Sequence, residues 1–163
     1  MNRADEPQGC LFAILNLLWP APADRSVTVG LPYKRKDYLL TKAERSFFGV
    51  LQKAVGDRYL IFAKVRLADL MYIPRGVEQW QSYFNRIKSK HIDFVLCDRD
   101  AVRPLLAIEL DDSSHREADR QSRDTFVDSA LKAAGLPILH VAARFNYSAQ
   151  GLAHEIQQEL EAH

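Results

Sequence analysis

Cysteine is scarce in this sequence, which has only Cys10 and Cys97 among its 163 residues. Two cysteines cannot build a disulfide framework or a zinc site of four thiolates, and no cleavable secretory signal is evident. Glycine and proline are also few, at 7 each, while hydrophobic residues make up 47% of the chain. This composition argues against disordered, collagen-like and low-complexity classes. We expect a folded protein in a reducing, cytoplasmic setting.

Long apolar runs are lacking too. The N-terminal run, residues 10–19, contains Asn16 and stops at Pro20, well short of the roughly 18 apolar residues that a membrane span needs. We expect it to form a helix that packs on this domain or on a partner protein, or else to associate peripherally with a membrane surface. The sequence thus divides into an apolar segment with a linker, residues 1–37, and one domain, residues 38–163.

Several catalytic fingerprints are missing as well. The chain has no Gly-x-Ser-x-Gly sequence, and Cys97 lies in an apolar stretch, so serine or cysteine hydrolase chemistry is poorly supported. Walker and dinucleotide-binding fingerprints are also absent. The chemistry must therefore be sought in other residue types.

Net charge is small, at +1, but the two signs are separated along the chain. Residues 31–90 carry 13 Lys and Arg against 5 Asp and Glu, whereas residues 91–163 carry 7 against 13. A basic part beside a carboxylate-rich part suits a protein that holds a polyanion and acts on it with a metal. A scattered, solvated surface would give the same counts.

Apolar periodicity and cap residues predict an ordered set of helices and strands. The predicted helices cover residues 41–55, 78–87, 114–134 and a last segment opened by Ser148, and the predicted strands cover residues 59–65, 91–97, 104–110 and 138–141. The second and third strands should form an antiparallel hairpin, and the third and fourth a βαβ crossover. The fold class is α/β or α+β, with a mixed sheet flanked by helices.

Three carboxylates are the most informative residues. Glu109 and Asp111 share one face at the end of an apolar strand, because side chains alternate along a strand. Asp93 lies between apolar residues of the neighbouring strand, where an acid is costly to bury unless it is paired or binds a cation. Oxygen-only clusters suit Mg²⁺ or Mn²⁺. Alternatively, the three acids cap strand ends or face water.

Two further residues allow a structural and a chemical interpretation. Glu44 completes a capping box with Thr41, yet it also lies on the helix face turned toward the sheet, from which it could reach a metal. Lys64 shares one strand face with Arg66, where a cation could stabilise charge developing on a phosphate, although a solvated strand end is the plain alternative.

The predicted helix after Asp111 adds three candidates. Arg120 and Arg123 extend its core-facing stripe toward the acidic strand ends, where they would meet either phosphate oxygens or the acids themselves. His115 could be a general base, a metal ligand or a surface residue.

Four blocks in this order resemble a known family: Leu39–Phe48, Phe62–Asp69, Ile92–Asp98 and Ala107–His115. They are similar to domain-of-unknown-function family 2726, over about residues 34–146. That family is placed in the PD-(D/E)XK superfamily of restriction-endonuclease-like nucleases, whose core order is α-β-β-β-α-β. The resemblance therefore implies the same order that the apolar periodicity predicts.

The resemblance also implies roles for individual residues. Asp93 and Glu109 would hold the metal jointly, with the Leu110 carbonyl as a further ligand, and Glu44 matches the acid often found on the first helix. Asp111 departs from the family pattern, because Glu-x-Lys would place a lysine there. Lys64 or His115 would then orient the attacking water.

The function expected from this resemblance is a Mg²⁺- or Mn²⁺-dependent phosphodiesterase, with nucleic acid as its partner. We expect a DNA endonuclease rather than an RNA nuclease. The missing lysine leaves one alternative open, a catalytically inactive nucleic-acid-binding or scaffold domain that keeps the nuclease fold.

Overall fold

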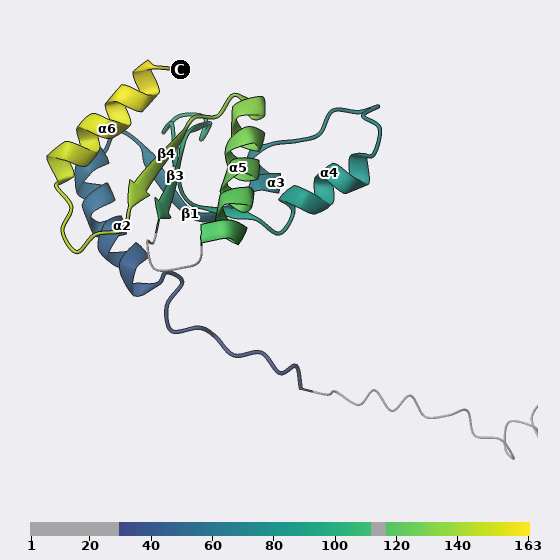
Figure 1. The fold of residues 1–163 in the computed structure, drawn as a ribbon. Coiled ribbons are helices and arrows are strands. Elements are labelled where there is room, and N and C mark those ends of the chain that lie inside the picture. The colour runs from purple at the N-terminus through teal and green to yellow at the C-terminus, as the bar shows by residue number, and fades with distance from the viewer. Residues whose placement is uncertain (1–29, 112–116) are drawn as a thin grey trace, which may run out of the picture. The chain divides into compact units, whose positions relative to one another are not determined.

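The computed structural model describes residues 30–111 and 117–163, with the side chains of residues 117–125 left out (Figure 1). Tyr38–His163 forms one compact unit. Residues 30–37 contain no helix or strand. The apolar run at residues 10–19 and the helix cap expected at Ser114 lie outside the described residues.

Four strands make an open mixed sheet in the order β1-β2-β3-β4. The strands are β1 (Leu60–Arg66), β2 (His91–Cys97), β3 (Pro104–Asp111) and β4 (Ile138–Ala142). The pairs β1–β2 and β2–β3 are antiparallel, whereas β3 and β4 are parallel. The predicted hairpin and the predicted crossover are both confirmed, and the protein is a mixed α/β structure.

Five described helices flank the sheet: α2 (Lys42–Val55), α3 (Leu67–Leu70), α4 (Trp80–Ile87), α5 (Glu117–Ala134) and α6 (Ala149–Glu161). In Figure 1, α2 and α6 lie on one side of the strands, and α3, α4 and α5 lie on the other. The expected helices are present: α2, α4 and α5 end at the predicted residues, and α2 begins one residue and α4 two residues after the predicted starts, as is usual for helix termini. The short α3 was not predicted.

Two hydrophobic clusters, one on each side of the sheet, hold these layers together. Phe94 and Leu96 of β2 pack with α2 and α6, while Val95 and Cys97 of the same strand pack against Leu131 of α5. Alternating side chains thus bury both faces of β2. Burial of each large apolar side chain contributes about 1.5–3 kcal/mol, so this two-sided core fixes the strand that carries Asp93.

Local signals explain where the helices next to the site begin and end. Thr41 caps α2 through its side chain, which accepts a hydrogen bond from the Glu44 amide, and Ser148 caps α6 in the same way. Gly56 ends α2 with a φ of 55°, a conformation that costs glycine little. None of the helices within residues 30–111 and 117–163 is long and apolar enough to cross a membrane.

Candidate functional site

A polar cavity of about 320 Å³ lies where the first turn of α2 meets the sheet. Its lining includes four of the sequence-predicted acids, together with one predicted cation: Glu44, Asp93, Glu109, Asp111 and Lys64. They come from α2, β1, β2 and β3, which the chain order separates by up to 67 positions. The fold therefore gathers into one cavity five of the residues that the sequence singled out.

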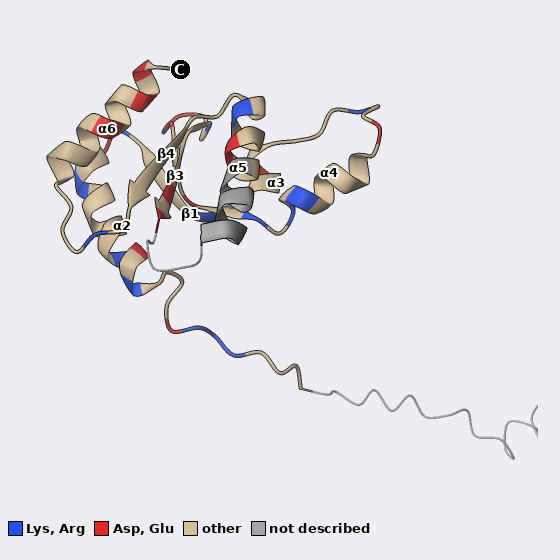
Figure 2. Cartoon of the chain, viewed as in Figure 1, with Lys and Arg blue, Asp and Glu red and all other residues tan. Residues whose placement is uncertain are grey.

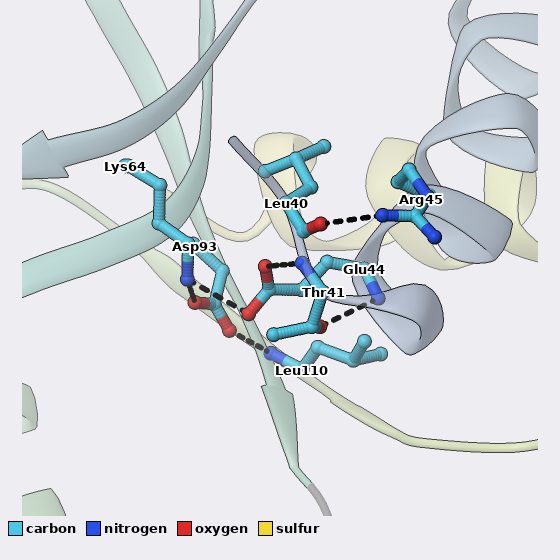
Figure 3. A network of polar contacts seen from close by, with 7 residues as sticks. All are labelled: Leu40, Thr41, Glu44, Arg45, Lys64, Asp93 and Leu110. Carbon is cyan, nitrogen blue, oxygen red and sulfur yellow. Dashed lines mark hydrogen bonds and ion pairs between the residues drawn. The ribbon is translucent and has the colours of Figure 1, made fainter. Parts of the chain in front are cut away.

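Asp93 and Glu109 are cross-strand neighbours. Backbone pairing of β2 with β3 includes Phe94 opposite Ile108, and one further step in that register places Asp93 opposite Glu109. Asp93 also accepts a hydrogen bond from the Leu110 amide at 3.1 Å, so its carboxylate takes the place of a ladder bond (Figure 3). The two acids that the sequence analysis expected to share a metal thus lie side by side.

Lys64 joins this acid pair to α2. Its ammonium nitrogen lies 2.8 Å from Asp93 Oδ1 and 2.8 Å from Glu44 Oε1 (Figure 3). All three side chains are largely buried, with exposed fractions of 23% for Lys64, 13% for Asp93 and 12% for Glu44. At this depth the three charges interact more strongly than on an open surface.

These contacts lower the pKa of Asp93 and raise the pKa of Lys64. Burial alone would raise the pKa of Asp93, but hydrogen bonds from Lys64, from the Leu110 amide and with Glu109 together hold it below its ordinary value. Burial alone would lower the pKa of Lys64, and its hydrogen bonds to Asp93 and Glu44 raise it instead. Asp93 and Lys64 are therefore both charged at neutral pH.

The backbone at Lys64 is strained. Its φ of 57° is in the left-handed region, which costs a residue with a side chain about 1–2 kcal/mol. Ala63 packs in the α2–α6 cluster and Val65 in the α5 cluster, although a regular strand would place both on one face. Rotation at Lys64 accounts for this change of face.

Arg66 does not join the site. The strand period predicted that it would share a face with Lys64, but it forms a two-bond ion pair with Asp69 and is well exposed. The rotation at Lys64 breaks the alternation on which that prediction rested.

Glu44 both caps α2 and reaches the cavity. One carboxylate oxygen, Oε2, accepts the Thr41 amide at 2.9 Å and completes the capping box, while Oε1 accepts the Lys64 ammonium. Capping fixes the side chain in the orientation that reaches the cavity. The structural and the chemical interpretation are therefore compatible.

His140 is a cavity residue that the sequence analysis missed. It lies beside Glu109 in the parallel register of β4, and its ring nitrogens lie 3.2 Å from Asp111 Oδ2 and 3.1 Å from Asp128 Oδ1. The signal was available, because a histidine within an apolar strand after a crossover must lie next to the acidic strand. Asp128 was missed for want of any local motif.

The three remaining candidates lie outside what the structure describes. His115 lies outside the described residues, and the side chains of Arg120 and Arg123 do too, although α5 includes both positions. The Cys97 thiol is buried, and this burial raises its pKa, so it is no nucleophile.

The donors in the cavity suit a hard cation. Among the described residues, no three His, Cys, Asp or Glu side chains are arranged as a ready metal-binding group. Mg²⁺, however, is commonly bound through one or two carboxylates, with waters and substrate phosphates completing its shell. The neighbouring carboxylates of Asp93 and Glu109 fit that mode, which predicts weak binding without substrate.

Comparison with known proteins gives one family. The model of the family described as Protein of unknown function (DUF2726) matches residues 36–160. Comparisons with curated proteins and with solved structures find no match.

Proposed function

We propose a nuclease function for this chain, which belongs to the family described as Protein of unknown function (DUF2726). In this proposal it is a metal-dependent phosphodiesterase of the restriction-endonuclease-like PD-(D/E)XK type, and it acts on nucleic acid, with DNA as the substrate and endonucleolytic cleavage as the reaction.

The order of elements supports the fold assignment. Without the short α3 and α4, the chain runs α2-β1-β2-β3-α5-β4. This order is the α-β-β-β-α-β core that the sequence resemblance implies. The candidate acids also occur where that fold type would need them, at adjacent positions of its second and third strands.

One observation carries the proposal: Lys64 is bonded to Asp93 in the cavity that Glu109 also lines. The departure at Asp111 removed the lysine that the Glu-x-Lys pattern would supply from β3. Lys64 supplies a cation to the same acid pair from β1. The Lys64 ammonium reaches this acid pair from a neighbouring strand, as a replacement for that lysine would have to do.

The residues then take the following roles. Asp93 and Glu109, with the Leu110 carbonyl, would hold Mg²⁺ or Mn²⁺, which when bound would supply a more acidic water and a positive charge beside the scissile phosphate. Lys64, from a position fixed by Glu44, would orient the attacking water and stabilise negative charge on the phosphate oxygens. Arg120 and Arg123 of α5 hold phosphate oxygens.

The ion pairs also favour a second candidate. Lys64 already forms ion pairs with Glu44 and Asp93 without a metal. A domain that had lost its chemistry would keep such a pair to stabilise its fold. The second candidate is therefore an inactive nucleic-acid-binding or scaffold domain with the same architecture.

A cleavage assay separates the two candidates. The protein is incubated with supercoiled plasmid, single-stranded DNA and RNA, each with Mg²⁺, Mn²⁺ or EDTA. The nuclease proposal requires cleavage of DNA that depends on the metal and stops with EDTA. A protein inactive on every nucleic acid with every metal is the scaffold domain.

A further inference from the structure

A second, apolar groove lies on the other side of α5 from the candidate site. It measures about 670 Å³, within the range of about 300–1,000 Å³ typical of ligand sites. Its lining comes from the segment after α3, from the side of α4 that carries Tyr83 and Ile87, and from Phe126 and small residues of α5. The candidate site does not use this groove.

Exposed aromatic rings surround the groove. Tyr72 is 87% exposed and Tyr83 is 50% exposed, and both line it. Trp80, on the first turn of α4, remains 42% exposed while its ring stacks on Phe84 at 5.0 Å. Two of these rings, Tyr72 and Tyr83, are exposed within the groove itself, which indicates a binding surface.

The charge around the groove is positive. Residues 71–90 contain Arg75, Arg86, Lys88 and Lys90 and a single acid, Glu78. Figure 2 shows these blue segments on the loop before α4, at the end of α4 and on its connection to β2. None of the described residues that line the groove is acidic. An anionic partner is thus favoured over a neutral one.

Two of these cations lie over Phe126, which α5 contributes to the groove. The Arg86 guanidinium lies 4.0 Å from the centre of the Phe126 ring, and Lys90 Nζ lies 5.5 Å from it. The next residue of α5, Val127, and the next residue after Lys90, His91, line the catalytic cavity. The groove and the cavity therefore take neighbouring residues of one helix, Phe126 and Val127.

We infer that this groove binds unpaired bases of single-stranded DNA, which stack on Tyr72 and Tyr83 while Arg86 and Lys90 contact the phosphates between the groove and the catalytic cavity. Aromatic rings beside a basic track are the usual means of holding single strands, because every base has a face that stacks. A base inside a duplex is stacked between its neighbours and offers no free face. The inference rests on the proposed function for its biological meaning, since it makes DNA with an unpaired segment the preferred substrate.

The test measures binding without cleavage. Fluorescein-labelled dT20 and a hairpin duplex of equal length are titrated with the full chain in EDTA, and fluorescence polarisation reports the affinity. We expect wild type to bind dT20 more tightly than the duplex. The double variant Tyr72→Ala/Tyr83→Ala should bind dT20 about fivefold or more less tightly, since a stacked base is worth that much or more.

Matched variants separate stacking from folding. Tyr72→Phe/Tyr83→Phe keeps both rings and should restore the affinity, and Phe145→Ala removes a fully exposed ring that lies outside the groove and should leave it unchanged. Thermal unfolding of each variant shows whether the fold is retained. Equal dT20 affinity of wild type and Tyr72→Ala/Tyr83→Ala overturns the inference, and the rings would then be a protein contact.

Salt dependence gives an independent readout. Each lost phosphate contact lowers the slope of log affinity against log salt by about 0.7 for a single strand. Arg86→Gln/Lys90→Gln should lower it for dT20, whereas Lys53→Gln on α2 should not; an unchanged slope in the former contradicts the charge argument. Cleavage is measured in a separate assay. If Tyr72→Ala/Tyr83→Ala binds dT20 as wild type does while the plasmid is still cleaved, only the groove inference fails. If this variant binds dT20 more weakly but the wild type cleaves no nucleic acid, only the nuclease proposal fails.

Discussion

Replacing Lys64 by Met removes the cation from a largely buried cluster while keeping most of the apolar stem. Breaking a fully buried ion pair costs about 3–5 kcal/mol, and an exposed pair contributes about 0.2–1 kcal/mol. Lys64 is 23% exposed and bonds two carboxylates at 2.8 Å each, which places Lys64→Met between these limits. We expect it to lower the free energy of unfolding by about 2 kcal/mol at pH 7.

The cause of the loss can be identified from its pH and metal dependence. Without the ammonium, Asp93 and Glu44 face each other as like charges, and protonation or a divalent cation would relieve them. Urea unfolding should therefore show a deficit that shrinks as the pH falls toward 4, and Mg²⁺ should raise the melting temperature of Lys64→Met more than that of wild type. Lys53→Met, at an exposed position of α2, is the control. A deficit independent of both pH and Mg²⁺ would refute this reasoning.

Three further predictions follow from the same cluster. Glu44→Gln keeps an amide oxygen that can accept the Thr41 amide but loses the ion pair from Oε1 to Lys64, so it should lower the free energy of unfolding by about 1 kcal/mol and DNA cleavage tenfold or more; unaltered turnover would leave Glu44 as a cap and an anchor for Lys64. The lowered pKa of Asp93 means that this group stabilises the fold at pH values above its ordinary pKa of 3.8, and that the stabilisation is lost as the pH falls through the folded pKa. Wild type should therefore lose more stability on acidification than Asp93→Asn. Parallel curves of stability against pH would contradict the assignment. Of Lys64→Met and His115→Ala, one should lower the cleavage rate by about 10²–10⁴-fold and the other little, and two near-wild-type rates would exclude both as the water-orienting group.

The elements around the site could be predicted because each has a strong local signal. The capping box of Thr41 and Glu44 predicts the start of α2, and Gly56 predicts its end. The apolar runs of β2 and β3, joined by a short polar turn, predict a hairpin. Asp93 and Glu109 were identifiable because each acid lies within an apolar run, where a carboxylate is costly to bury unless it has a partner.

What could not be predicted depends on backbone rotation and on register across the sheet. Lysine does not favour a positive φ, so nothing in the sequence indicates one at Lys64. That the side chains of Lys64 and Arg66 make contacts in different places could therefore not be predicted. The contact of His140 with Asp128 depends on how α5 lies over β4. No pattern within either element encodes that distance.

Cleavage of supercoiled plasmid by the acid variants tests the central claim most directly. Asp93→Asn and Glu109→Gln are compared with wild type in Mg²⁺ and in Mn²⁺, and Glu155→Gln, an exposed acid of α6, is the control. If Asp93 and Glu109 hold one cation, each substitution should lower the single-turnover rate by about 10²-fold or more, and the control should match wild type. Metal-dependent cleavage that persists in both Asp93→Asn and Glu109→Gln would contradict the account.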